Sequence, residues 1–413
     1  MFENVLFQSA SKLLSNDIAN GNLPGSVLFS GPYASGKLSC ALELARVLSC
    51  QKCGSWQCKC PNCLQNKALV SPNVLLVGSG NRTLEIRAAK DTLLYQNVNN
   101  SIHLDSARYL YLRAVRKLTL RFSPVLWEGD DKLSKFSPLL QSINEELEKI
   151  NPGRIIPDGD ELQKILDAVE KHCEKLESTY LYDSLPVQQI RNFSTWARLS
   201  SSNGKKVIVI ENADCMAESA RNALLKILEE PPENTVFVLT TANRGAMLPT
   251  ILSRVRTYTF FTRTKEQQQT VISRLFYYSN ASLKTNLPDS IVAFLQNYLP
   301  VKPELVKTQA KLYFDTITGG HVPDIPAVMA ECRGFSPRIL FTLFLQEIVT
   351  VQSYLCRSPA GAECSAKIVE KLRLANNNVT VFNQNPASAL EQLTRDFMQI
   401  NHLNGGVFRI GNE

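Results

Sequence analysis

Residues 24–49 read PGSVLFSGPYASGKLSCALELARVLS, which has the order strand, loop, helix. An apolar run at 27–29 leads into a loop bounded by glycines, after which apolar side chains recur at helical spacing from 41 to 48. Two more apolar runs, KVIVI at 206–210 and TVFVLTT at 235–241, flank a helical pattern at 217–230 that Pro231 and Pro232 end. Strands that alternate with helices predict an α/β fold with a parallel sheet.

The loop at 31–37 comes close to the pattern G-x-x-x-x-G-K-S/T, whose backbone N–H groups surround nucleotide phosphates at the start of a helix. The last position holds a leucine, so the hydroxyl that normally binds Mg²⁺ is missing, and the next serine lies about 100° further around the helix. We predict a phosphate-loop (P-loop) fold, whereas ATP binding stays open, because a degenerate loop could be kept for its tight turn alone. The candidate nucleotide-binding residues here are Gly31, Ser35, Gly36, Lys37, Leu38 and Ser39.

Acidic residues follow the strand at 206–210. A hydrolysing ATPase of this class places Asp-Glu at this point, to hold Mg²⁺ and to activate water. Glu211 supplies the first acid and is a further candidate nucleotide-site residue, but Asn212 replaces the catalytic carboxylate. Asp214 is better interpreted as an ordinary acid at a helix N-terminus than as a displaced substitute. Together with Leu38, this pattern predicts that hydrolysis is weak or absent.

The segment that begins with the strand at 235–241 offers two more kinds of contact. Thr241 and Asn243 stand where the end of a strand could reach a γ-phosphate. Arg254 follows Ser253 in a predicted turn from helix to strand, and an arginine there can stabilise charge on a phosphate held by a neighbouring subunit. Taken alone, however, a single arginine in a loop is more often a solvated or ion-paired side chain.

Five of the eleven cysteines crowd between positions 50 and 63, which favours metal binding over disulfides in a reducing compartment. They are Cys50, Cys53, Cys58, Cys60 and Cys63. Four thiolates suit a tetrahedral Zn²⁺ with a structural role and leave no open position for catalysis. We predict that four of the five bind zinc, either the two CxxC pairs 50–53 and 60–63 or the set in which Cys53 is the bystander.

Length and charge set the remaining bounds. A chain of 413 residues suggests two to four domains, at about 100 to 200 residues each. The absence of an apolar run of about 18 residues and of a signal peptide predicts a cytoplasmic protein without membrane contact. The net charge of +7 decides little. Residues about 100–183 form a mostly helical insertion, in which a basic run from Arg108 to Arg121 either contacts DNA or forms a solvated helix face.

Several blocks together resemble the bacterial DNA polymerase III clamp-loader subunits, which are AAA+ proteins. The blocks are PGSVLFSGPYASGK, CQKCGSWQCKCPNC followed by SPNVLLVG, LPVQQIRNFSTWARLSSSNGKKVIVIENADCM, ARNALLKILEEPPENTVFVLTTAN and LPTILSRV. Within that family, gamma/tau subunits hydrolyse ATP, whereas delta-prime subunits often have impaired nucleotide sites. Leu38, Asn212 and the wording IENADCM after the strand are more similar to delta-prime.

The resemblance implies three domains: an AAA+ P-loop-like domain at 1–262 with the zinc module at 50–63, a helical lid at 263–330, and a helical collar at 331–413 that forms a hetero-oligomeric ring. It implies a stator of the DNA polymerase III holoenzyme, with gamma/tau and delta subunits as partners and the sliding clamp and primed DNA reached through the complex. Arg254 resembles the arginine that a subunit supplies to its neighbour's ATP. The alternative is a gamma/tau-type subunit that hydrolyses ATP itself, with Mg²⁺, Lys37 and Glu211.

Overall fold

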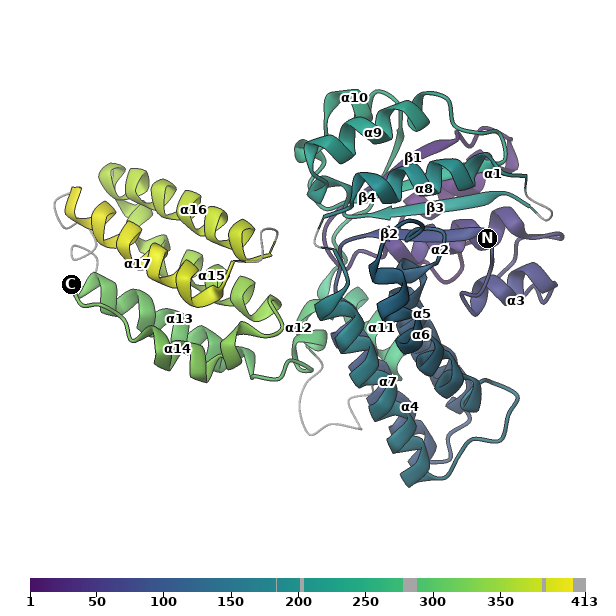
Figure 1. Cartoon of the computed structure of the whole chain (residues 1–413), viewed down its shortest axis with the longest axis horizontal. Helices are drawn as coiled ribbons and strands as arrows, with labels where there is room; N and C mark the ends of the chain where they lie inside the picture. Colours follow the sequence, from purple (N-terminus) through teal and green to yellow (C-terminus); the bar gives the residue numbers. More distant parts are fainter. Residues whose placement is uncertain (183, 201–203, 278–287, 381–383, 404–413) are drawn as a thin grey trace. The chain divides into compact units, whose positions relative to one another are not determined.

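The computed structural model describes residues 1–182, 184–200, 204–277, 288–380 and 384–403. The chain divides into two compact units, Met1–Leu295 and Gln296–Glu413. The first unit has the α/β fold with a parallel sheet that the sequence predicts, and the second is helical in its described residues (Figure 1). The division into three domains stays a prediction.

The sheet of the first unit has five parallel strands in the order β2-β3-β4-β1-β5. All three runs predicted as strands lie within this sheet. The first of them, β1, lies between β4 and β5, with Leu28 opposite Leu239 on one side and opposite Thr257 on the other. The strands are β1 (Ser26–Ser30), β2 (Val74–Gly78), β3 (Lys206–Glu211), β4 (Thr235–Thr241) and β5 (Arg256–Thr259).

Both faces of the sheet are covered. Every residue of β1 and β4 is buried, which explains why these strands read as continuous apolar runs and not as alternating patterns. Successive side chains enter two different cores: Val27 and Phe29 belong to one, and Leu28 belongs to the other. The same alternation places Val209 and Ile208 on opposite faces.

Helices α1 (Ala10–Ala19) and α2 (Lys37–Ser49) contribute to the core that contains Phe29. The core on the other face contains side chains from helices on both sides of the predicted insertion and from the insertion itself, so residues 100–182 pack as part of the first unit (Figure 1). These helices are α4 (Thr83–Val98), α5 (Leu104–Thr119), α6 (Lys132–Lys149), α7 (Gly159–Thr179), α8 (Val187–Arg198), α9 (Glu218–Glu229) and α10 (Pro249–Leu252). The short α3 (Pro61–Lys67) follows the cysteine segment, and α11 (Lys265–Phe276) and α12 (Ile291–Gln296) follow the sheet.

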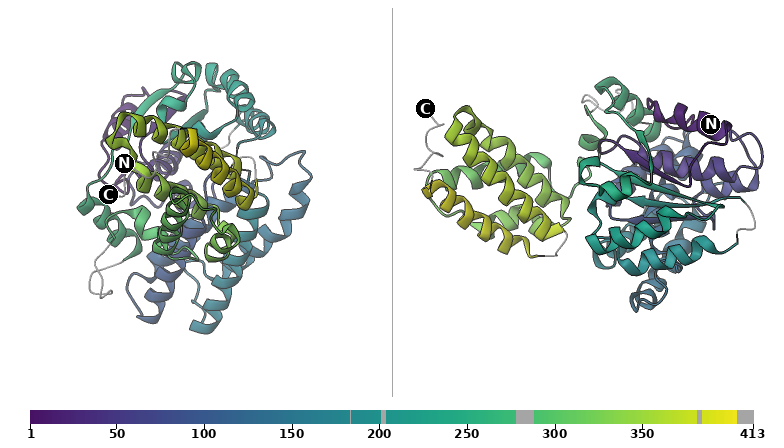
Figure 2. Two further views of the ribbon diagram at one scale, coloured as in Figure 1. Left: turned by 90° about the vertical axis from the view of Figure 1, so that its left-hand side faces the viewer. Right: turned by 90° about the horizontal axis from the view of Figure 1, so that it is seen from above.

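The second unit packs α13 (Pro303–Thr318), α14 (Ile325–Glu331), α15 (Ile339–Val351), α16 (Pro359–Thr380) and α17 (Pro386–Leu403) side by side (Figure 2). One stretch in the described residues, Ile339–Arg357, is long and apolar enough to cross a membrane by those two criteria. Leu340, Phe341 and Phe344 of this stretch are fully buried, and Phe344 packs edge-on against Tyr313 of α13. Its apolar character is therefore explained by its place in the core of the helical unit.

Candidate nucleotide site and metal centre

The predicted phosphate loop connects the end of β1 to the start of α2 at the carboxyl edge of the sheet, where ligands bind in open α/β folds. Gly36 adopts a left-handed conformation with φ of 96°, directly before the first residue of α2. A Cβ atom at this position would lie 2.9 Å from Nη2 of Arg263. The Nη1 atom of the same guanidinium group donates to the carbonyl oxygen of Ala34 (2.9 Å). Glycine is required at this turn, and Arg263 fixes the loop from outside.

Lys37 is turned onto its own loop. Its Nζ donates to the carbonyl oxygens of Gly31 and Pro32, both at 2.6 Å. The Ser35 hydroxyl likewise donates to Pro32 (2.8 Å). Burial lowers the pKa of Lys37 to about 8, although the nearby carboxylates of Asp214 and Glu211 oppose that shift. In this arrangement the loop satisfies its own lysine, and a phosphate would have to displace those carbonyl contacts.

The two residues after Lys37 do not restore a metal-binding hydroxyl. Leu38 is half-buried and packs against the core that contains Phe29. Ser39 is exposed. A nonpolar side chain therefore occupies the position from which a hydroxyl would bind Mg²⁺.

Glu211, the remaining acid of the predicted catalytic pair, is held by two arginines. Its carboxylate forms ion pairs with the guanidinium groups of Arg82 and Arg121, and its side chain is only 12% exposed. Burial raises the pKa of Glu211, but the two guanidinium groups outweigh burial and hold that pKa below its ordinary value. Both carboxylate oxygens accept from Arg82, so Mg²⁺ would have to compete with two guanidinium groups for this acid.

The ion pairs continue into the helices that cover this edge. Glu85 pairs with Arg82 (3.5 Å) and with Lys117. Glu177, on α7, accepts from the backbone N–H of Arg82 (2.6 Å) and from the Thr83 hydroxyl (2.9 Å) at the start of α4. Glu177 of α7 thus fixes the start of α4, directly after the arginine that pairs with Glu211.

Asn212 has a structural role. It adopts the left-handed conformation (φ 52°, ψ 53°) that asparagine tolerates better than most residues, and its Nδ2 donates to the carbonyl oxygen of Ser79 (2.8 Å). Asp214 lies in the short helical turn that follows, where its carbonyl oxygen accepts from Arg221 (2.8 Å). Asp214 Oδ1 is buried and has no hydrogen-bond partner among the described residues.

The end of β4 borders the phosphate loop through its backbone, since the N–H of Gly31 donates to the carbonyl oxygen of Thr241 (3.1 Å). The Thr241 side chain is fully buried and accepts from the N–H of Asn243 (3.0 Å). Asn243 is exposed, and its Oδ1 accepts from the N–H of Gly245 (3.1 Å). Of these two candidates, only Asn243 presents a side chain to the surface.

Arg254 follows α10 in the turn that leads to β5. Its Nη1 donates to the carbonyl oxygen of Thr250 (2.7 Å), and its Nε donates to Glu229 at the end of α9 (3.1 Å). The side chain is 29% exposed and that of Glu229 is 51% exposed. The guanidinium group therefore sits at the surface in an ion pair that solvent reaches.

The cysteine segment brings four thiols together. The sulfur atoms of Cys50, Cys58, Cys60 and Cys63 all lie within 4.8 Å of one another, whereas Cys53 is exposed and outside the group. Cys50 and Cys58 are 3.7 Å apart, and a tetrahedral zinc with bonds of about 2.3 Å has sulfur-to-sulfur edges of about 3.8 Å. Burial opposes ionisation of Cys60, but hydrogen bonds from the N–H groups of Gln51 and Cys63 and from neighbouring thiols lower its pKa to about 6. The cluster could bind zinc.

Comparisons with known proteins identify the family of this chain. The family described as DNA polymerase III, delta subunit, matches residues 7–121 and 154–264, which is more than half of the chain. The chain belongs to this clamp-loader family. The DNA polymerase III delta' subunit of Haemophilus influenzae is 40% identical over 73 residues, 17% of this chain and 22% of that protein. The gamma/tau subunit of Mycobacterium bovis is 34% identical over 70 residues, 17% of this chain and 12% of that protein.

The matched segments span less than a quarter of these relatives' own lengths. A solved gamma subunit-related protein of DNA polymerase III from Thermotoga maritima is 18% identical and covers 57% of this chain and 90% of that chain, with a TM-score of 0.27. The match to the clamp-loader family is interrupted between residues 121 and 154, a segment that contains α6 and lies inside the insertion predicted at about 100–183. The extent of the insertion stays a prediction.

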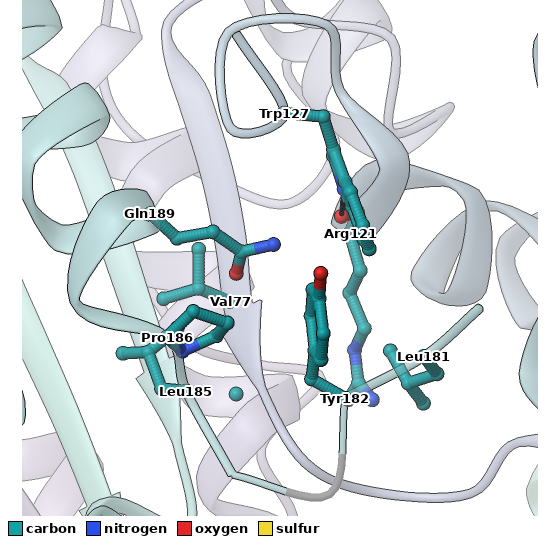
Figure 3. A pocket seen from close by; sticks show the side chains of 9 residues that line it. Val77, Arg121, Trp127, Leu181, Tyr182, Leu185, Pro186 and Gln189 are labelled. Carbon is teal, nitrogen blue, oxygen red and sulfur yellow. Dashed lines mark hydrogen bonds between the residues drawn. The ribbon is translucent and has the colours of Figure 1, made fainter. Parts of the chain in front are cut away.

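A pocket at the carboxyl end of β2 lies between this interrupting segment and the sheet (Figure 3). Trp127 and Tyr182 stack in it with ring centroids 5.1 Å apart, and Trp127 Nε1 donates to the carbonyl oxygen of Arg121 (2.8 Å). Since the Arg121 guanidinium already pairs with Glu211, the pocket offers no uncommitted charge to a phosphate. Its lining comprises Val77, Gly78, Arg121, Trp127, Leu181, Tyr182, Leu185, Pro186 and Gln189.

In this clamp-loader family member the basic run at 108–121 is internal, so it is neither a solvated face nor available to DNA. Arg108 is 4% exposed and donates to the carbonyl oxygens of residues 150 and 151, at the end of α6 (3.0 and 2.6 Å). Arg113 donates to the carbonyl oxygen of Lys67, and Arg116 donates to the carbonyl oxygen of Ala68 (2.7 Å), at the end of α3. Guanidinium groups at the carboxyl end of a helix satisfy free carbonyls and complement the helix dipole.

The sequence patterns did not predict three arginines that contact these sites. Arg82 is the partner of Glu211, Arg263 fixes the phosphate loop, and Arg46 lies against Cys63. A signal existed for Arg82, because it follows β2 and the carboxyl ends of neighbouring parallel strands meet at one edge. Arg263 and Arg46 carry no comparable signal, since their partners lie in segments whose packing the sequence does not reveal.

Proposed function

We propose that this clamp-loader family member is a delta-prime-type stator that does not hydrolyse ATP. The observation that carries the proposal is the pairing of Glu211 with Arg82 and Arg121, which occupies the only acid of the predicted catalytic pair. Leu38 supports it independently, because no hydroxyl stands directly after Lys37. The residues present do not fit Mg²⁺ at this site. A phosphate would fit if Lys37 left the carbonyl oxygens of Gly31 and Pro32, because the lysine and the N–H groups at the start of α2 could then donate to it.

We further propose that Arg254 completes the ATP site of a neighbouring subunit. Its ion pair with Glu229 is solvent-accessible, and exposed ion pairs contribute at most about 1 kcal/mol. The guanidinium group can therefore leave Glu229 for a phosphate at small cost, and planar N–H donors stabilise charge on a transferring phosphoryl group. The backbone contact of Nη1 with Thr250 keeps the side chain at the turn before β5.

We propose that Cys50, Cys58, Cys60 and Cys63 hold a structural Zn²⁺. The spacing of their sulfur atoms fits a tetrahedral ion, and three of the four are buried. When bound, the ion would tie down a segment that has little core of its own.

The partners follow from the family. We propose gamma/tau and delta subunits as neighbours in a ring in the cytoplasm, with the sliding clamp and primed DNA reached through that complex. A second candidate, a gamma/tau-type ATPase, is favoured by the retained Gly31, Gly36 and Lys37 and by the likeness to the mycobacterial gamma/tau subunit. Mg²⁺ would then have to find other ligands than Glu211.

Turnover by the purified chain separates the two candidates. We expect no ATP hydrolysis with Mg²⁺ and primed DNA above that of a Lys37→Ala variant, while the chain still assembles with gamma/tau and delta subunits in size-exclusion chromatography. Hydrolysis that disappears in Lys37→Ala would establish the gamma/tau-type candidate instead. Failure to assemble would contradict membership of the ring.

A further inference from the structure

Arg46 is a charged residue that the proposed stator function does not use, and it is among the most deeply buried side chains of the first unit. It lies on α2 and is 1% exposed. Its Nε and Nη2 donate to the carboxylate of Glu43, one turn earlier on the same helix, at 3.0 and 2.6 Å. Glu43 is equally buried. Burial of an ion pair is costly unless the remaining N–H donors also find partners, so the contacts of the other Arg46 donors matter.

Those donors all point into the cysteine segment. Nη1 donates to Cys63 Sγ (3.1 Å) and to the carbonyl oxygen of Ser55 (3.0 Å), and Nη2 donates to the carbonyl oxygen of Gly54 (2.7 Å). One planar group thus reaches a candidate ligand and the loop that connects two of the others. The fixed fork of the guanidinium group allows this, whereas a lysine ammonium could not match the same set.

Charge explains why a cation belongs there. Four thiolates around Zn²⁺ carry a formal charge of 2 − 4 = −2, and Glu43 brings this to −3 in a buried region. The Arg46 guanidinium is the positive group that contacts both Glu43 and Cys63. A hydrogen bond to a thiolate from a charged donor stabilises the ionised sulfur that zinc requires.

We propose that Arg46 is a positioning residue of the zinc site: its Nη1–H stabilises the Cys63 thiolate, and its other N–H groups hold the loop at residues 54–55 so that the four sulfurs converge. This inference rests on the proposed binding of zinc, and it names a residue outside the four ligands that raises the affinity of the site for Zn²⁺. It also connects the ion to α2, because the same helix begins at Lys37 and ends directly before Cys50. Groups that orient metal ligands typically change metal affinity by about 10- to 100-fold.

The test compares two variants of the full chain that differ only at Arg46. Glu43→Gln alone removes the ion pair and leaves Arg46 against Cys63, whereas Glu43→Gln with Arg46→Met also removes the guanidinium without leaving an unpaired buried carboxylate. Competition with a chromophoric chelator measures Zn²⁺ affinity. We expect Glu43→Gln to bind Zn²⁺ as tightly as the wild type or more tightly, and the double variant to bind about 10- to 100-fold more weakly.

Substitution with Co²⁺ gives a readout that loss of packing would not move. Removal of the donor leaves more electron density on one sulfur, so the thiolate-to-metal charge-transfer band of the double variant should shift to lower energy than that of Glu43→Gln. Equal affinities within about twofold, with superimposable Co²⁺ spectra, would overturn the role of Arg46. A wild-type chain that binds no Zn²⁺ would instead overturn the zinc proposal itself, and the two failures are thereby distinguished.

Discussion

Replacing Glu211 by Gln should destabilise this protein, whereas loss of a metal-binding acid from an active ATPase site would relieve repulsion and cost little stability. The carboxylate is 12% exposed and neutralises Arg82 and Arg121, whose side chains are 11% and 2% exposed. Removing one partner of a buried ion pair leaves uncompensated charge and costs about 3 to 5 kcal/mol. We expect the Glu211→Gln variant to lose a free energy of unfolding in that range at pH 7.

The pH dependence has a definite sign. Because the two guanidinium groups hold the pKa of Glu211 below its ordinary value, its contribution is complete above the pKa of the unfolded chain and is lost as the pH falls through the lower pKa of the folded state. The difference in stability between wild type and Glu211→Gln should therefore shrink in acid. Urea unfolding followed by circular dichroism, at pH 7 and at about pH 3, measures it.

Glu233→Gln is the matched control, since Glu233 is exposed in the turn before β4 and its neutralisation should change stability by less than about 0.5 kcal/mol. A Glu211→Gln variant whose free energy of unfolding lies within about 1 kcal/mol of the wild type would show that Glu211 is not part of a stabilising buried ion pair. That result would mean that the arginines do not depend on Glu211 and that this acid is free to serve a metal.

Two further predictions concern the phosphate loop and the cysteines. Lys37 has a pKa of about 8 in the folded protein against an ordinary value of 10.5. Between these pH values the unfolded chain binds more protons than the folded protein. The free energy of unfolding of the wild type should therefore rise with pH in this range, by about 3 kcal/mol at most. Lys37→Met should lack this rise in urea unfolding at pH 7.5 and about pH 10.5, and an unchanged slope would contradict the burial of the ammonium group. Cys58→Ser should abolish stoichiometric zinc in metal analysis, while Cys53→Ser should retain it; retention in both, or loss in both, would exclude the proposed ligand set.

Much of the fold could be predicted because it depends on local patterns. The run at 27–29, the glycine-bounded loop and the helical spacing after Lys37 appear in order within one segment, and both covered faces of the sheet leave their mark as unbroken apolar strands. The zinc segment is equally local. The choice among five cysteines was not, because the CxxC spacing of Cys50 and Cys53 is correct while the fold of the loop turns Cys53 outward.

Charges could not be interpreted from sequence because their partners are distant. Arg121 and Glu211 are 90 positions apart, and Arg82 and Glu211 are 129 apart. A basic run on a helix looks the same whether it meets phosphates, water or the carbonyl end of another helix, and in α5 it meets α3 and α6. Only packing distinguishes these cases. Packing also brings Arg82 and Arg121 against Glu211, the one retained acid.

The proposed action of Arg254 on a neighbour's ATP can be measured in a reconstituted clamp-loader complex in which only the ATP site next to this chain keeps its P-loop lysine. Arg254→Ala should lower ATP hydrolysis at that site by about 10³-fold without changing assembly, because it removes the arginine that would act on the neighbour's phosphate. Arg256→Ala, a neighbouring arginine paired with Asp17 at 3.1 Å, should leave hydrolysis unchanged. Hydrolysis by the Arg254→Ala complex at the wild-type rate would show that Arg254 does not act on the neighbour's ATP.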